Sequence, residues 1–160
     1  MVVTVNDPAG TPANRKVALS NLGQAISPAW ITWSPTLANL SGGTLNFARY
    51  IKIGKNVHFK FKYTLGGAGV GTGPTFTPPL TPHADELPSS GYNQIGLAAL
   101  LDDGTLNYIG SVAFTSTSPV NILSWNAGGA YSSLAALSST IPFTWASGDI
   151  IFAQGSYEEA

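Results

Sequence analysis

Hydrophobic and polar side chains alternate with a period of two over residues 56–65, the clearest pattern in the chain. The apolar positions are Val57, Phe59, Phe61, Tyr63 and Leu65, and the polar positions between them are His58, Lys60, Lys62 and Thr64. A helix would instead place its apolar residues three and four positions apart. The pattern therefore predicts a strand with one buried face and one polar face.

Turn residues divide the rest of the chain into short runs of the same kind. The pair Gly54-Lys55 predicts a tight turn that joins this strand to residues 44–53 as a hairpin. Asp102-Asp103-Gly104 supplies a second turn, because Asp-Gly pairs tolerate positive φ. Further strands are predicted at residues 29–37, 75–77, 93–101, 106–115, 120–125 and 149–157.

The intervening segments predict loops and very little helix. The glycine-rich residues 66–73 are expected to form an inter-strand loop, and the proline-rich residues 74–88 an edge strand or a loop. Short helical turns are predicted at residues 19–26 and, more weakly, at 132–137. About eight strands with long connections predict an all-β fold, an antiparallel β-sandwich of the jelly-roll type.

Residues 1–28 differ in character from residues 29–160, the predicted jelly-roll domain. This N-terminal segment cannot bury a core alone, so it is expected to become ordered by docking on a partner. We interpret it as an anchor whose apolar contacts are Val3, Val5, Val17, Leu19 and Leu22.

Charge is scarce, and this bears on assembly. Charged residues make up 9% of the 160 residues, against roughly 25% in ordinary soluble domains. Low-charge, apolar surface is typical of obligate interfaces, so much of the surface is expected to be buried in an oligomer. The alternative is a surface kept soluble by the abundant Ser, Thr, Asn and Gly residues.

Composition also argues against several classes of function. A net charge of −1 does not favour nucleic acid as a partner, and the absence of cysteine leaves no thiolate chemistry. The first residues lack the pattern of a signal peptide, and no apolar run has the length of a membrane span. We therefore expect a product made in the cytoplasm, without membrane insertion.

Enzyme-like motifs fail on closer reading. The glycines of residues 66–73 precede Pro74 rather than a helix that would aim backbone donors at a phosphate. His58 and His83 have no partner at metal-ligand spacing, although a histidine shared on a threefold axis stays an alternative. Asp102 and Asp103 are turn residues that point apart. No catalytic, metal or cofactor site is predicted, and the chain is expected not to be an enzyme.

Two sets of residues are candidates for binding. Five of the seven basic residues lie between positions 49 and 62, and the binding candidates among them are Arg49, Lys52, Lys60 and Lys62. Such a patch suits anionic glycans or acidic protein surfaces, although a solvated sheet face explains it equally well. Trp125 and Tyr131 flank the loop Asn126-Ala127-Gly128-Gly129 and offer rings for stacking. Trp33 and Trp145 are expected in the core or at an interface.

Three parts of the chain resemble bacteriophage appendage proteins. Residues 7–12 (DPAGTP) and 16–22 (KVALSNL) resemble the neck ahead of fibre knobs. Residues 33–37 (WSPTL) and 48–59 (ARYIKIGKNVHF) resemble the opening strands of tail-fibre and head-fibre knobs. Residues 144–151 (TWASGDII) and 155–158 (GSYE) resemble their closing strand, and are also similar to trimeric jelly-roll heads related to tumour necrosis factor. The middle, residues 66–137, carries no such resemblance.

The resemblance implies a homotrimeric virion appendage. Residues 1–28 would attach to capsid or tail proteins, and the knob would bind a host cell-surface glycan or protein. The alternative is a head-decoration or cement protein that stabilises the capsid without recognising a receptor.

Overall fold

Antiparallel strands account for most of the chain in the computed structural model, which describes residues 29–40, 42–67 and 69–160. In chain order the strands are β1 (Ile31–Thr32), β2 (Leu37–Leu40), β3 (Thr44–Ile53), β4 (Asn56–Thr64), β5 (Val70–Phe76), β6 (Asn93–Asp102), β7 (Leu106–Phe114), β8 (Val120–Asn126), β9 (Ser133–Ala136) and β10 (Ile150–Glu158). One turn of 3-10 helix, η1 (Ala84–Glu86), lies between β5 and β6. No helix in this part of the chain is long and apolar enough to cross a membrane.

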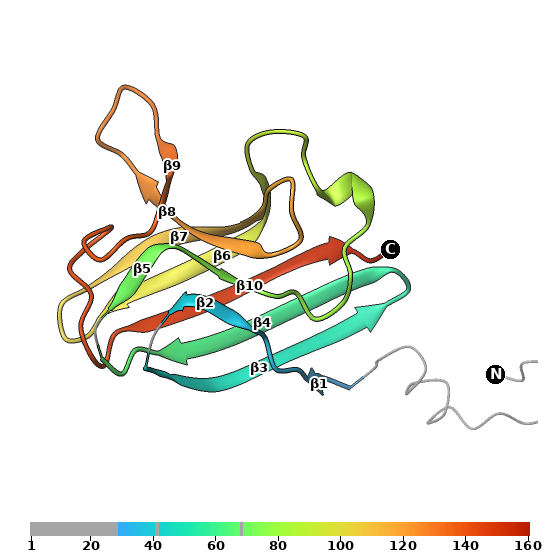
Figure 1. The fold of residues 1–160 in the computed structure, drawn as a ribbon, viewed down its shortest axis with the longest axis horizontal. Coiled ribbons are helices and arrows are strands. Elements are labelled where there is room, and N and C mark those ends of the chain that lie inside the picture. Colours follow the sequence, from blue (N-terminus) through green and yellow to red (C-terminus); the bar gives the residue numbers. More distant parts are fainter. Residues whose placement is uncertain (1–28, 41, 68) are drawn as a thin grey trace, which may run out of the picture.

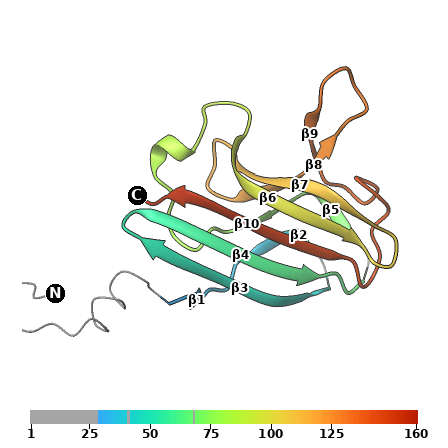
Figure 2. The same ribbon diagram turned by 180° about the vertical axis from the view of Figure 1, so that it is seen from behind.

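The strands form one sheet that curls into a sandwich. Their order is β1-β3-β4-β10-β6-β7-β8-β5-β2, and β9 pairs with β8. In Figure 1 the strands β2 and β5 lie in front of β3, β4 and β10, and Figure 2 shows the opposite face, which no described strand covers. The predicted all-β antiparallel sandwich is confirmed, and its strand order is jelly-roll-like because β10, the last strand, inserts between β4 and β6.

The core lies between the two layers and is built around β4. The alternating residues Val57, Phe59, Phe61, Tyr63 and Leu65 are all buried, as the pattern predicts. Across the sandwich, the ring of Phe76 on β5 lies 4.7 Å from that of Phe61 and 5.6 Å from that of Phe59. These edge-on and tilted contacts hold the layers together, because aromatic pairs add to the free energy of burial.

The hairpin predicted between residues 44–53 and 56–65 is also confirmed. Ile53 pairs with Asn56, and Gly54 takes a φ of 62° in the two-residue turn. The predicted strands at 93–101, 106–115, 120–125 and 149–157 correspond to β6, β7, β8 and β10. Trp145 is buried in the core, and the partly buried Trp33 packs against Phe59 and Phe61, so their predicted core placement is confirmed.

The segment predicted as one strand at residues 29–37 is instead two strands in different layers. β1 pairs with β3 and β2 pairs with β5, so residues 33–36 cross from one layer to the other. The Trp33 N–H donates to the Ala48 carbonyl on one side, and the Thr77 N–H donates to the Thr36 carbonyl on the other. Pro35, which has no N–H, stands in this crossing and cannot continue a ladder.

Two loop and helix predictions are wrong for local reasons. The glycine-rich loop ends early, because β5 begins at Val70 and runs against β2. A Cβ on Gly71 would lie 3.0 Å from the Cβ of Asn39, so glycine permits this close pairing. Residues 132–137 contain the strand β9 rather than a helix, because pairing with β8 overrides the weak helical propensity of a short segment. The other helix, predicted at 19–26, lies outside the described residues.

Tyr157 fastens the proline-rich loop to the sheet. Its hydroxyl donates to the Leu80 carbonyl at 2.8 Å and accepts from the Leu80 N–H at 3.0 Å. The ring packs against Phe114 and Phe59. Burial raises the pKa of the Tyr157 hydroxyl well above its ordinary value, an effect that the hydrogen bond with Leu80 partly offsets.

We predict that Tyr157→Phe lowers the free energy of unfolding at pH 7 by about 1–2 kcal/mol, because Leu80 loses both partners. Above a pH of about 10, where an unfolded tyrosine ionises, the wild-type protein should lose stability, because its folded state retains the proton. The variant lacks this contribution, so the difference between the two proteins should shrink as pH rises. Urea unfolding across this pH range measures both effects, and a constant difference between the proteins would contradict this account.

Candidate functional site

The outer face of the sheet presents side chains in straight rows across β3, β4, β10 and β6. The register pairs Arg49 with Lys60, Lys60 with Gln154, and Gln154 with Leu97. Paired residues in antiparallel strands project from the same face, so this row lies on the face opposite the core. Successive residues of a strand point to opposite faces of the sheet. Because Phe59 and Phe61 point into the core, Lys60 between them points to the outer face.

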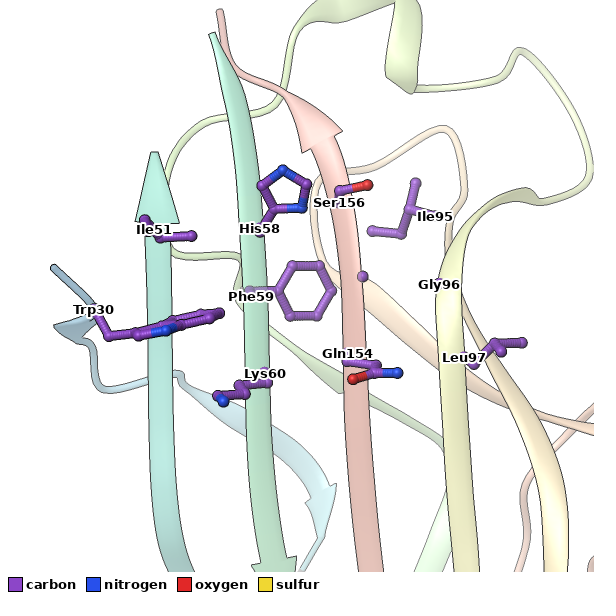
Figure 3. Close-up of a pocket in the computed structure, with 11 residues that line it drawn as sticks. Trp30, Ile51, His58, Phe59, Lys60, Ile95, Gly96, Leu97, Gln154 and Ser156 are labelled. Atoms are coloured by element: carbon purple, nitrogen blue, oxygen red, sulfur yellow. The ribbon is translucent and has the colours of Figure 1, made fainter. Parts of the chain in front are cut away.

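A groove crosses this face and encloses about 510 Å³. Figure 3 shows its residues: Trp30 and Ile51 lie at one side, His58 and Lys60 project from β4, and Gln154 and Ser156 project from β10. Leu97 on β6 closes the other side.

Two paired glycines form the far side of the groove. Gly155 on β10 faces Gly96 on β6, beside an irregularity in the register at Gln94 and Gly96. A Cβ on Gly155 would lie 2.6 Å from the Ile95 carbonyl oxygen and 2.9 Å from Cζ of Phe59. A Cβ on Gly96 would lie 2.0 Å from the Gln154 carbonyl oxygen. Only glycine at both positions lets β6 and β10 approach this closely while Phe59 fills the core beneath them.

Trp30 and Lys60 form the near rim of the groove. The Lys60 ammonium lies 4.5 Å from the centroid of the Trp30 ring, within the range of a cation–π contact. The indole is 44% exposed, so much of its apolar surface faces solvent. Trp30 is not among the binding residues predicted from the sequence, because its position beside Lys60 depends on β1 pairing with β3 across the hairpin.

The basic residues predicted to bind are divided by the structure. Arg49, Lys60 and Lys62 share the outer face, and within the described part of the chain none of them has an ion-pair partner. The Arg49 guanidinium lies 5.8 Å from the ring of Phe47. Lys52 points away from this group and forms an ion pair with Glu159. Of the four basic residues predicted to bind, the three that have no ion-pair partner among the described residues therefore lie on the face that holds the groove.

The predicted aromatic pair lies outside the groove. Trp125 is at the end of β8, and its Nε1 donates to the Ser111 hydroxyl at 2.7 Å. Tyr131 is 89% exposed in the loop between β8 and β9, which projects from the sandwich in Figure 1. Neither residue lines the groove. The predicted anchor residues Val3, Val5, Val17, Leu19 and Leu22 lie outside the described residues.

An exposed apolar strip, hereafter the apolar belt, continues the outer face beyond the groove. Register and alternation place five residues in it, of which Ala99 and Phe152 are half-buried: Leu97, Ala99, Ile109, Trp125 and Phe152. Leu97 is 50% exposed and Ile109 67% exposed. The sequence signal for this belt is that β6 and β7 carry apolar residues on both faces, a feature that period-two alternation does not reveal.

The buried carboxylate of Asp149 serves the fold. One oxygen accepts from the Asp103 N–H at 2.9 Å and the other from the Ala146 N–H at 2.6 Å, so Asp149 joins two turns at one end of the sandwich. In the described part of the chain, no group of three or more His, Cys, Asp or Glu residues is placed to hold a metal ion.

Comparison with models of known protein families, with curated protein sequences and with solved structures finds no significant match.

We predict that Gly155→Ala lowers the free energy of unfolding by about 1–3 kcal/mol, as overpacking of a filled core does. The matched control is Gly67→Ala, because a Cβ there meets no atom within 4 Å. Urea unfolding of the two variants should separate them clearly. Equal stabilities would show that β6 and β10 are not held as closely as the structure indicates.

Proposed function

We propose that this chain is a non-enzymatic virion structural protein, a homotrimeric bacteriophage surface appendage that binds a host surface molecule through its sandwich domain. Attachment to capsid or tail proteins is assigned to residues 1–28. The proposal rests on the resemblance of the neck, opening and closing segments, and on the surface of the folded domain.

The apolar belt is the observation that supports this proposal most strongly. Ile109 pairs with Ala99, and Leu97 projects from the same face of β6 two residues away, so these exposed side chains adjoin on one sheet face rather than standing singly. Moving a fully exposed Leu or Ile into a core contributes about 1.5–3 kcal/mol, so covering these partly exposed side chains contributes a fraction of that each. A contiguous exposed apolar patch on a domain with so little charge marks a contact with another protein.

Copies of the same chain are the partner that we favour. In a closed ring of subunits, each copy covers the apolar belt of its neighbour. No belt then stays exposed, and the assembly does not grow into an open filament. The number three comes from the resemblance to trimeric jelly-roll heads. The belt lies next to the groove, so assembly would leave the basic part of the outer face free.

Three of the eight Asp and Glu carboxylates in the chain are held by contacts within the fold. Glu86 accepts from the Asn93 side chain at 2.9 Å and from the Glu158 N–H at 2.7 Å. Asp149 accepts two backbone N–H groups, and Glu159 pairs with Lys52. These three carboxylates are therefore not available for the free carboxylate pair that glycoside hydrolysis needs.

A capsid decoration or cement protein is the second candidate, because a shell protein could cover the apolar belt as well as another copy could. On virions, loss of a cement protein should weaken the shell. Loss of an attachment protein should leave intact particles that fail to adsorb.

We predict that the purified full-length protein has a mass in solution three times that of the 16.6 kDa chain, measured by light scattering after size exclusion. Ile109→Lys should dissociate it, because each copy would place a charge in an apolar contact. Ile53→Lys is the control, because Ile53 is 53% exposed at the hairpin end, away from the belt. A monomeric wild-type protein at micromolar concentration, or an Ile109→Lys trimer, would refute the assignment of the belt.

A further inference from the structure

We infer that the groove between Trp30 and Leu97 is a binding site for an anionic saccharide, a sugar chain carrying carboxylate or sulfate groups. Its biological role rests on the proposed function as an attachment module, but the site itself is argued from its own residues. It is formed by β3, β4, β10 and β6 together with the segment that leads into β1.

The size of the groove suits a small or extended ligand. Its volume of about 510 Å³ lies in the range of ligand sites, roughly 300–1,000 Å³. No described strand covers this face of the sheet in Figure 2, so a chain longer than the groove can continue past either end. A polysaccharide needs such an open site, whereas a small metabolite is usually enclosed.

Trp30 supplies an apolar surface for a sugar ring. The C–H groups on one face of a pyranose pack on aromatic rings, and indole is the largest such surface available to a protein. The Lys60 ammonium lies over one part of the indole, and the exposed remainder of the ring is the surface available to a sugar. Leu97 provides a second apolar contact on the opposite side.

Polar side chains between these two walls are available to hydroxyl groups. His58, Gln154 and Ser156 line the groove, and none of their side chains forms a hydrogen bond within the described chain. Together they offer donors and acceptors in a row along β4 and β10. A site with an apolar platform and several unpaired polar groups matches the mixed character of a saccharide.

The charge of the groove selects an acidic ligand over a neutral one. Lys60 lines it, and Arg49 is the direct cross-strand neighbour of Lys60. No carboxylate lines the groove, and Glu158 lies one row beyond Ser156 on β10. Carboxylate or sulfate oxygens would form charge-assisted hydrogen bonds with Lys60, which are stronger than neutral ones.

A nucleic acid is less well matched to this surface. Phosphate backbones are bound by many cations, and their affinity depends on the number of phosphates neutralised. The outer face offers Arg49, Lys60 and Lys62 on a chain of net charge −1. A short single-stranded DNA is the probe that tests this alternative.

The test is isothermal titration of the full-length protein with three anionic oligosaccharides: tetragalacturonate, α2,8-linked trisialic acid and a chondroitin sulfate tetrasaccharide. Maltotetraose is the neutral comparison. At least one anionic probe should bind with a measurable Kd and maltotetraose should bind at least about tenfold more weakly. Failure of all three at millimolar concentration, equal binding of maltotetraose, or tighter binding of the DNA would overturn the inference.

Variants locate the site. Lys60→Gln and Trp30→Ala should each weaken binding by about tenfold or more, because each removes a direct contact. Lys55→Gln is the matched control: it removes the same charge from the exposed β3–β4 turn, so its Kd should stay within about threefold. Equal losses in Lys60→Gln and Lys55→Gln would show nonspecific charge attraction and refute the groove.

Circular dichroism and light scattering of each variant keep the two proposals distinct. A trimer that binds no saccharide refutes the groove and leaves the assembly intact. A monomer that binds the anionic probe with the expected variant pattern supports the groove and refutes the trimer.

Discussion

The packing of Phe59 and Phe61 on β4 against Phe76 on β5 is the contact on which the rest of the molecule depends. This contact joins the two layers of the sandwich. Because every second residue of β4 points into the core, the residues between these core positions must point outward. His58, Lys60 and Lys62 are therefore external for the same physical reason that the aromatic residues are internal. A shift of one residue in the register of β4 would exchange the two sets and destroy both the core and the groove.

Much of the fold was accessible from local patterns because those patterns report pairing within hairpins. The alternation at residues 56–65 and the turns at Gly54 and Gly104 specify contacts between neighbours in sequence, and these predictions are confirmed. The failures are non-local. Nothing near residues 29–37 reveals that the chain crosses between layers at Pro35, and the Ala-rich segment at 132–137 becomes a strand only because β8 is beside it.

The candidate site shows the same division. Alternation placed Lys60 and Lys62 on one face, but it could not bring Trp30 over Lys60, because that contact depends on the pairing of β1 with β3. Lys52 lies nearby in sequence yet is paired with Glu159. The pairing of Gly96 with Gly155 joins segments almost sixty positions apart, so the groove could not be deduced from either segment alone.

Under the proposed function, one sheet face serves two purposes. The apolar belt occupies the part of the face toward β7 and β8, the basic groove occupies the part toward β3 and β4, and Leu97 belongs to both. Covering the belt with neighbouring subunits would place the groove at the margin of each interface. Ligand binding and assembly would then be adjacent in space while depending on different chemistry, dispersion and burial in one case and charge in the other.

The central claim is that identical copies cover the apolar belt, and the absence of cysteine from the chain allows a direct measurement of it. A single thiol introduced by Ile109→Cys or, in the exposed loop before β8, by Ser116→Cys can be labelled with a maleimide under native conditions. The account predicts that the thiol at position 109 reacts far more slowly than the one at 116, although Ile109 is 67% exposed in a single chain. Equal labelling rates at the two positions would contradict it.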